Sequence, residues 1–509
     1  MFAFAIWDAK KRRLFLARDR LGKKPLYYWQ GNDKFVFGSE IKAILQHTEV
    51  PRQVDLEALQ LYLAFGYVPA PWTMFAGIKK LPPGHSLLCD PEGVRVERYW
   101  DITFIEGARR VAVGDAIDEI RWRVQEAVRL RLIADVPLGA FLSGGVDFVT
   151  IVALMAQASS TPVKTFTVGF DIDGWYNEFK EARLVAQRYH TEHYETVLSA
   201  PDVPELLAKV LWHLDEPIAD PAALPTYLIC EFAWHHVTVV LTGEGGDELF
   251  GGYPRYGWFQ RAKRFESFLP SLARSALLGI TTSLPMSQMA RHSARLLLSD
   301  LSDAERHLLW VGMFHRKEHT FARQFANSST QHLTTLECLV SAYLDGGPRD
   351  ALVHRLMYLD MKTWLVDDIL MKVDKMSMAV SLEARAPFLD HKLMEFVVTL
   401  PEDLKIYGRQ TKWLLKKAFA DLLPERITRR RKHAFRVPTG DWFRGKLRAY
   451  ISEQLLAPHS AVGRYLGREQ VQSLVQEHLH GGANHEQSLW TLLCFELWHR
   501  MFIDGEQVA

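Results

Sequence analysis

The sequence predicts an α/β protein that begins with a short antiparallel β region, continues with a parallel sheet flanked by helices, and ends in a helical region. Three observations support this fold class. Strand-like runs separated by turn residues fill positions 1 to about 45, apolar runs alternate with helical stretches from about 115 to 241, and the pattern beyond about 255 is mainly helical.

The first 45 residues contain four short runs with strand composition. The runs at 2–7 and 14–17 are separated by a charged turn, and those at 25–29 and 35–37 by Gln30-Gly31-Asn32-Asp33. Turn residues between strand-like runs are typical of hairpins, so two antiparallel hairpins are expected. The stretch from 81 to 101 is rich in proline and irregular, which predicts a connection between two domains.

A second domain is expected to start near Asp115, where the hydrophobic period becomes helical. Ile117, Ile120 and Val124 lie on one stripe, and Arg121 and Arg123 lie off it. Strands are then predicted at 137–142, 163–170 and 237–241, with helices at 148–157 and 182–189 between them. Strands that alternate with helices imply right-handed crossovers and a parallel sheet.

Composition limits the function classes that fit this chain. Its 509 residues include 61 Lys and Arg against 60 Asp and Glu, so no bulk positive charge is available to hold a nucleic acid. No run of about 18 uncharged apolar residues predicts a membrane-spanning helix. The four cysteines are scattered without a C-x-x-C pair, which favours a reducing, cytoplasmic location over a disulfide framework or a thiolate zinc site.

The sharpest motif is Ser143-Gly144-Gly145-Val146-Asp147, between a predicted strand and a predicted helix. Two glycines allow a tight turn, and their amides with the following helix N-terminus form a concave site for phosphate. Asp147 would then hold Mg²⁺ against the phosphate oxygens. The alternative is a plain strand-to-helix turn in which Asp147 only caps the helix.

The second loop follows the strand at 237–241 and contains Thr242, Gly243, Glu244, Asp247 and Glu248. Ligands of open α/β sheets bind outside the carboxyl ends of the strands, so this loop and the first are expected to face one crevice. Three carboxylates beside glycines favour a metal or catalytic role. Neither loop fits a dinucleotide or Walker pattern.

These residues resemble the glutamine-hydrolysing asparagine synthetases of the bacterial type. The resemblance extends over essentially the whole chain and rests on segments 17–28, 143–147, 241–253, 381–390, 411–415 and 438–443. It implies a class II glutamine amidotransferase region at 1–95 and a synthetase domain of the ATP-pyrophosphatase type at 112–509. The amidotransferase class uses an N-terminal cysteine nucleophile to release ammonia from glutamine.

The resemblance also implies the chemistry of the second domain. MgATP converts the side-chain carboxylate of aspartate into a β-aspartyl-adenylate, and ammonia then attacks to give asparagine, AMP and pyrophosphate. Asp147 and Asp247 match Mg²⁺ ligands, Glu244 a catalytic carboxylate, and Lys412 a lysine that stabilises charge on the adenylate. The positions that match contacts to ATP are Leu142, Ser143, Gly144, Gly145, Asp147, Val168, Thr242 and Gly243. Without the resemblance, Lys412 would be taken for a solvated helix lysine.

Two departures from the family pattern stand out. The segment from Met1 matches the middle of the glutaminase region, so the nucleophilic cysteine has no counterpart and glutamine-dependent activity is expected to be lost. Strands at 1–95 would then have exposed edges or an altered packing. Phe148 stands where the family has a small hydroxyl residue, and losing one charge-assisted bond to pyrophosphate would cost about 1.5–3 kcal/mol.

The sequence leaves alternatives open. A related amidotransferase or cyclising ligase would act on another carboxylate, although Glu244 favours asparagine synthetase because the β-lactam-forming relatives place a tyrosine there. A non-catalytic descendant is the third reading, suggested by Phe148. The expected partners are small molecules, with no nucleic acid and no membrane. A homodimer is one assembly that the sequence leaves open.

Overall fold

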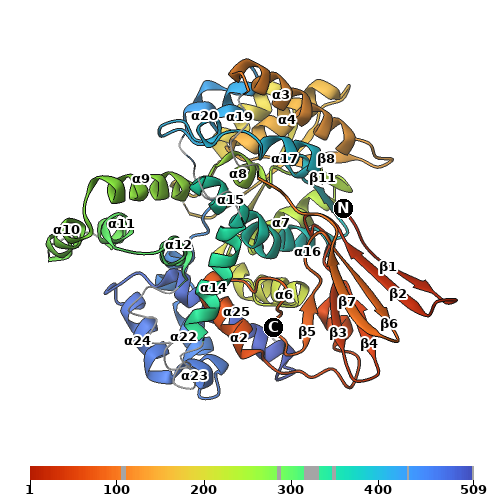
Figure 1. Cartoon of the computed structure of the whole chain (residues 1–509), viewed down its shortest axis with the longest axis vertical. Coiled ribbons are helices and arrows are strands. Elements are labelled where there is room, and N and C mark those ends of the chain that lie inside the picture. The colour runs from red at the N-terminus through yellow and green to blue at the C-terminus, as the bar shows by residue number, and fades with distance from the viewer. Residues whose placement is uncertain are drawn as a thin grey trace.

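A five-stranded parallel sheet forms the centre of the second domain in the computed structural model (Figure 1). The structure describes residues 1–104, 111–172, 174–283, 288–313, 332–346, 351–430, 432 and 435–506. The strand order is β10-β9-β8-β11-β12, and every neighbouring pair is parallel. The strands are β8 (Leu138–Phe141), β9 (Lys164–Phe170), β10 (Glu192–Leu198), β11 (Val239–Leu241) and β12 (Glu383–Arg385).

Helices connect and cover these strands. They are α3 (Val113–Arg131), α4 (Val146–Ala158), α5 (Phe179–Tyr189), α6 (Val203–Leu214) and α7 (Ala223–Trp234). The predicted stripe on α3 is confirmed, since Ile120 and Val124 are fully buried. Because β8 and β11 are adjacent and parallel, the loops that follow them emerge at the same edge of the sheet. The predicted α/β class is confirmed in this form.

The N-terminal region forms two small antiparallel sheets of order β1-β2-β6-β7 and β4-β3-β5. Their strands are β1 (Ala3–Asp8), β2 (Arg13–Arg18), β3 (Tyr27–Gln30), β4 (Phe35–Gly38), β5 (Ile78–Lys80), β6 (His85–Asp90) and β7 (Gly93–Arg98). Both predicted hairpins are confirmed. The irregular connection expected over 81–101 is wrong, because β6 and β7 form a hairpin there and β6 pairs with β2. Prolines 82 and 83 lie before that hairpin, so they interrupt no ladder.

Strand β1 lies at the edge of its sheet. An exposed strand edge in residues 1–95 is one of the two outcomes expected from the sequence. Ile6 and Trp7 are 56% and 59% exposed. Helices α1 (Ile41–Ile44) and α2 (Leu56–Phe65) bury apolar residues in the same core cluster as Tyr27 and Trp29 of β3. Tyr62 on α2 donates a hydrogen bond of 2.7 Å to the carbonyl of Thr491, so the N-terminal region packs against the last helix of the chain.

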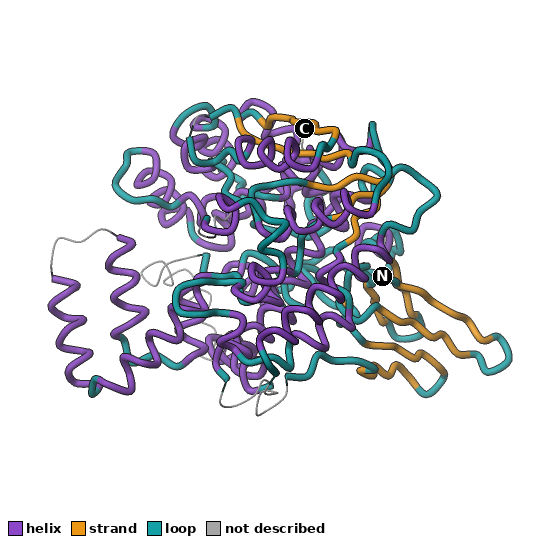
Figure 2. The backbone as a smooth tube through the Cα atoms, turned by 90° about the horizontal axis from the view of Figure 1, so that it is seen from above, coloured by secondary structure: helices purple, strands orange, loops and turns teal. Residues whose placement is uncertain are grey.

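The rest of the described chain is helical apart from β12. The elements are α8 (Gly246–Phe250), α9 (Pro254–Phe268), α10 (Ser271–Ser283), α11 (Gln288–Leu298), α12 (Asp303–Val311), α14 (His332–Asp345), α15 (Leu352–Lys362), the π-helical turn η3 (Leu365–Leu370), α16 (Met371–Met378), α17 (His391–Val397), α18 (Glu402–Lys405), α19 (Trp413–Ala418), α20 (Glu425–Arg429), α21 (Thr439–Arg444), α22 (Arg448–Leu456), α23 (Ala461–Leu466), α24 (Arg468–Leu479) and α25 (Glu486–Phe502), with short 3₁₀ turns η1 (Ala200–Asp202) and η4 (Pro387–Leu389). Figure 2 shows the N-terminal strands projecting from one side of the molecule and the α10–α11 pair from the other. No helix within the described residues is long and apolar enough to cross a membrane.

Candidate active site

A cavity of about 470 Å³ opens at the carboxyl ends of β8, β9 and β11. Its walls come from the first loop after β8, the second loop after β11, the η3–α16 segment and the start of α19. Every residue that the sequence assigns to the site lines this cavity except Thr242. Thr242 is buried beside it, and its amide donates to the carbonyl of Arg385, which extends the β11–β12 pairing.

The first loop joins β8 to α4 and presents the N-terminus of that helix to the cavity. The amide of Leu142 still pairs with β9, through the carbonyl of Phe166, and the helix begins at Val146. The Gly144 amide donates to Glu178 Oε2 at 3.4 Å, and Arg430 pairs with the same carboxylate at 2.6 Å. The amides of this turn therefore lie beside both an acidic and a basic side chain.

Asp147 is not the cap of α4. The N-cap is Gly145, and the Asp147 carboxylate, 5% exposed, forms an ion pair with the Lys412 ammonium. Its Oδ1 accepts no hydrogen bond among the described residues. The second loop approaches this carboxylate so closely that a Cβ on Gly246 would lie 2.2 Å from Asp147 Oδ1. Gly245 has a φ of 86°, a left-handed conformation that glycine adopts without steric cost.

Lys412 lies between the two aspartates that the sequence assigns to Mg²⁺. Its ammonium contacts Asp147 and also Asp247 Oδ1 at 2.6 Å, and Lys432 contacts the other oxygen of Asp247. Lys412 is 4% exposed and therefore not a solvated helix lysine. Its backbone has a φ of 53° where α19 begins, a left-handed conformation that costs a non-glycine residue about 1–2 kcal/mol.

Burial and charge act in opposite directions on this cluster. Burial raises the pKa of Asp147, and the nearby Lys412 only partly offsets it. Burial also acts to raise the pKa of Asp247, but the ammonium groups of Lys412 and Lys432 outweigh it and hold that pKa well below its usual range. Burial would lower the pKa of Lys412, yet the two aspartates raise it. Asp247 and Lys412 are thus both kept charged.

The arrangement fits a divalent cation that is shared with a bound phosphate. Two carboxylates already hold one cationic group between them, and one of their oxygens has no other partner. Among the described residues, no group of three or more His, Cys, Asp or Glu could hold a metal ion, so the two aspartates would need ligands from elsewhere. Mg²⁺ is commonly bound by one or two carboxylates together with substrate phosphates.

A second charged group lines another part of the cavity. Lys372 on α16 pairs with Asp220 and lies 3.7 Å from Asp368 Oδ1. Burial raises the pKa of Asp368 to about 8, against the opposing effect of Lys372. Glu244 lies on the neighbouring wall, where burial raises its pKa and its Oε2 lacks a hydrogen-bond partner within the described part of the chain.

Phe148 lies between the two loops. A Cβ on Gly243 would be 2.9 Å from Phe148 Cδ2, and the ring is partly buried against a cluster that includes Phe141, Phe166 and Ile229. The aromatic side chain therefore packs on the cavity wall. It offers no donor at the third residue of α4, as the sequence indicates.

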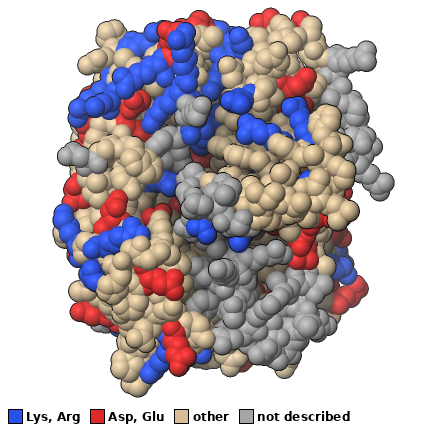
Figure 3. Space-filling view, turned by 90° about the vertical axis from the view of Figure 1, so that its left-hand side faces the viewer, with Lys and Arg blue, Asp and Glu red and all other residues tan. Residues whose placement is uncertain are grey.

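Sequence reasoning missed several residues of the cavity. Glu178, Arg430 and Lys432 contact the two loops, and Asp220 pairs with Lys372. The basic run at 429–432 is the one signal that could have pointed to them. Figure 3 shows Lys and Arg side chains gathered toward the top of one face, the end of the molecule where Figure 1 places α19 and α20.

Comparison with known proteins assigns both regions. The family model of asparagine synthase matches residues 119–500, and that of the glutamine amidotransferase domain matches residues 1–100. The glutamine-hydrolyzing asparagine synthetase 1 of Bacillus subtilis is 33% identical over 505 residues, which cover 99% of this chain and 78% of that protein.

The chain belongs to the asparagine synthetase family.

Of two further relatives, one is also named as an asparagine synthetase and the other is named as an amidase. A putative glutamine-hydrolyzing asparagine synthetase of Mycobacterium tuberculosis is also 33% identical, over 100% of this chain and 77% of that protein. The amidase chry2 of Gibberella zeae is 28% identical over 89% of this chain. The asparagine synthetase family and the ligase class predicted from the motifs are thus confirmed.

Proposed function

We propose that this chain catalyses the MgATP-dependent amidation of aspartate through a β-aspartyl-adenylate that ammonia attacks, giving asparagine, AMP and pyrophosphate. The observation that carries the proposal is the cluster of Asp147, Asp247 and Lys412 at the carboxyl ends of β8 and β11, next to the buried Glu244. We also propose the boundaries 1–95 for the glutaminase-like region and 112–509 for the synthetase domain.

The first loop is the proposed binding site for the ATP phosphates. The N-terminus of α4 would supply donors to an anion, and the amides of Gly144 and Gly145, which donate to Glu178 and to Ser143 Oγ in this structure, would exchange those partners for phosphate oxygens. Asp147 and Asp247 would hold Mg²⁺, which neutralises charge on the departing pyrophosphate. With the aspartates committed to the cation, the ammonium groups of Lys412 and Lys432 become available to the phosphate and adenylate oxygens.

Glu244 is the proposed proton acceptor. The ammonia lone pair attacks the acyl carbon, a C–N bond forms, and the bond from that carbon to the AMP oxygen breaks. The nitrogen then carries an excess proton, which passes to the Glu244 carboxylate. Burial raises the pKa of Glu244, and a raised pKa makes a carboxylate a better base near neutral pH.

Lys372 and Asp220 supply the proposed aspartate pocket, and the buried Asp368 faces Lys372 from behind the cavity wall. An ammonium that pairs with the substrate α-carboxylate, beside a carboxylate that accepts from the α-ammonium, matches both charges of an amino acid. An acceptor carboxylate that lacks an amino group would leave Asp220 without that partner. This observation favours aspartate over the other carboxylates that related amidotransferases use.

Ammonia is the proposed nitrogen source for these 509 residues. The one cysteine in residues 1–100 is Cys89 on β6, and burial raises the pKa of its thiol. A nucleophilic thiol needs the opposite shift.

The test is pyrophosphate release from MgATP and aspartate, with ammonium, with glutamine and with no nitrogen source. We expect pyrophosphate and asparagine with ammonium, and background release with glutamine. A parallel set with succinate in place of aspartate examines the acceptor. If folded protein releases no pyrophosphate in any of these reactions, the synthetase assignment is refuted. Equal turnover of succinate would refute the choice of aspartate.

A further inference from the structure

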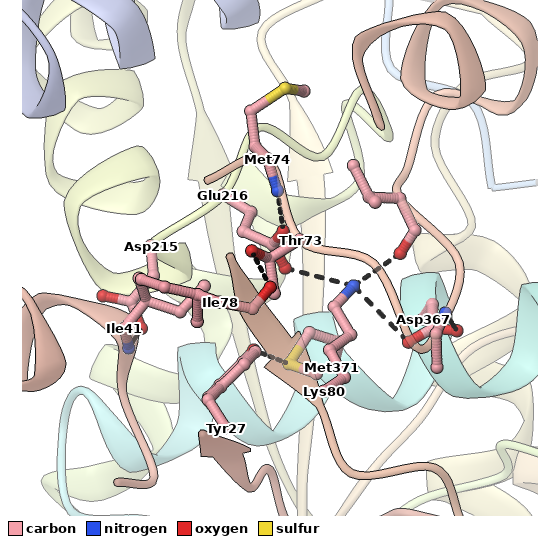
Figure 4. Close-up of polar contacts among 12 residues, drawn as sticks. Tyr27, Ile41, Thr73, Met74, Ile78, Lys80, Asp215, Glu216, Asp367 and Met371 are labelled. Atoms are coloured by element: carbon pink, nitrogen blue, oxygen red, sulfur yellow. Dashed lines mark hydrogen bonds and ion pairs between the residues drawn. The ribbon is translucent and has the colours of Figure 1, made fainter. Parts of the chain in front are cut away.

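A buried charged cluster joins the N-terminal region to the synthetase domain (Figure 4). Lys80, on β5, is 2% exposed, and its ammonium lies 3.1 Å from Glu216 Oε2 and 3.5 Å from Asp367 Oδ1. Glu216 follows α6 and Asp367 lies on η3, so one lysine of the N-terminal region contacts two separate parts of the synthetase domain.

The same two carboxylates also bind the backbone of the N-terminal region. The Ala70 amide donates to Asp367 Oδ2 at 2.8 Å, and the Met74 amide donates to Glu216 Oε1 at 2.7 Å. Lys80 itself donates to the carbonyl of Val68. The N-terminal region supplies every donor in this cluster and the synthetase domain supplies the two acceptor carboxylates, so segment 68–74 is held to Asp367 and Glu216. Burial raises the pKa of Glu216.

Asp367 connects this cluster to the cavity through the backbone of η3. Its neighbour Asp368 faces Lys372, and the adjacent Trp364 and Ile369 line the cavity wall. π-Helical turns are rare and occur frequently at functional sites. A displacement of Asp367 would also displace Asp368 and the start of α16. It would therefore displace Lys372, the lysine proposed to bind the substrate aspartate.

We infer that Lys80 is a positioning residue for the acceptor half of the synthetase site, acting through Asp367 and η3 on Asp368 and Lys372. The inference rests on the proposed function, because it takes the Lys372 pocket as the place where aspartate binds. It assigns to the N-terminal region a role in amidation that is independent of glutamine hydrolysis.

The chemistry of the cluster supports a positioning role. A buried ion pair contributes little net stability, because desolvation of the charges offsets their attraction, but it restricts the geometry that satisfies both partners. Lys80 forms ion pairs with two carboxylates and donates to one carbonyl, and these three partners lie on different segments. An apolar contact at the same place would tolerate sliding of η3 against the N-terminal region.

The test compares Lys80→Met with the control Lys42→Met in the full chain. Lys42 lies at the same interface and pairs with Asp215, which keeps its second partner Lys375 when Lys42 is replaced. We expect Lys80→Met to raise KM for aspartate at least tenfold and to leave KM for MgATP within twofold. Hydrogen exchange of the amides in 364–372 should become at least tenfold faster. Lys42→Met should change none of these quantities by more than twofold.

A second variant covers the case in which Lys80→Met does not fold. The triple variant Lys80→Met, Glu216→Gln, Asp367→Asn removes the three charges together, and the same rise in KM for aspartate is expected of it. Unchanged KM and unchanged exchange in a folded Lys80 variant would overturn the inference. If the wild type releases no pyrophosphate, the proposed function fails, and the exchange rates alone then decide whether Lys80 positions η3.

Discussion

Replacing Lys412 with methionine removes the ammonium that lies between Asp147 and Asp247 while keeping most of the side-chain volume. The two carboxylates then face each other in a nearly buried site, and only Lys432 still contacts one of them. We expect the variant to be less stable than the wild type and to have lost most of its synthetase activity. We also expect its stability to depend on Mg²⁺.

The size of these effects follows from the burial of the cluster. Removing one partner of a buried ion pair costs about 3–5 kcal/mol, and the remaining contact to Lys432 favours the lower value. Mg²⁺ no longer competes with an ammonium for the aspartates. At 100 times its Kd it would restore about 2.7 kcal/mol. For about 400 residues this corresponds to a rise in Tm of about 3 °C, given about 2.1 cal/mol/K of unfolding entropy per residue.

Thermal unfolding with and without 10 mM Mg²⁺, in the absence of ATP, measures this difference. The wild type should shift by less than about 1 °C, because the cation has to displace Lys412. Lys416→Met is the matched control: Lys416 lies one turn further along α19 and lines the same cavity, and this variant should respond like the wild type. Adding Asp147→Asn to Lys412→Met should abolish the response. If Mg²⁺ shifts Lys412→Met no more than the wild type, the two aspartates are not a cation site.

Three further substitutions test other parts of the molecule. Glu244→Gln should lower ammonium-dependent pyrophosphate release by about 10²–10⁴-fold while the rise in Tm with MgATP stays the same, and a parallel loss of the MgATP response would contradict a role confined to proton transfer. Phe148→Ser should raise kcat/KM for MgATP about ten- to a hundredfold, because the serine hydroxyl adds a donor to phosphate. The same change should lower the free energy of unfolding by about 2 kcal/mol, because the half-buried ring packs against Phe141 and Ile229. Burial raises the pKa of Glu496 to about 7, so the folded state favours the protonated acid and its contribution is lost as pH rises through 7. Denaturant unfolding should therefore show the wild type losing about 2 kcal/mol more than Glu496→Gln between pH 5.5 and 8.5, and identical pH profiles would contradict this.

The two loops of the site were predictable because their chemistry is local. Gly144 and Gly145 stand between a strand pattern and a helix pattern, and the carboxylates of the second loop follow an apolar strand. The rule that parallel strands present their carboxyl ends at one edge then brings Asp147 and Asp247 together. These residues line one cavity, as that rule predicts.

Other strands and site residues could not be predicted from a local sequence pattern. Strand β10 carries Glu192, His193 and Glu195, because it lies at the sheet edge and is only half buried. Strand β12 is three residues long, and its pairing with β11 depends on a segment about 140 residues away. The basic run that contains Lys432 is a weak signal and the lone Asp220 carries none, since charged residues of both kinds are usually solvated. Their roles come from tertiary contacts that no sequence window contains.

The order of the central sheet has a consequence for the time at which the site forms. The first loop is made early, but its neighbour β11 comes about 100 residues later, and the lysines that neutralise the aspartates come about 170 residues after that. During synthesis, a chain that has reached residue 400 contains both acidic loops and neither Lys412 nor Lys432. Such a chain has to keep the two carboxylates hydrated, so the sheet edge that later binds nucleotide cannot close before nearly the whole polypeptide has emerged.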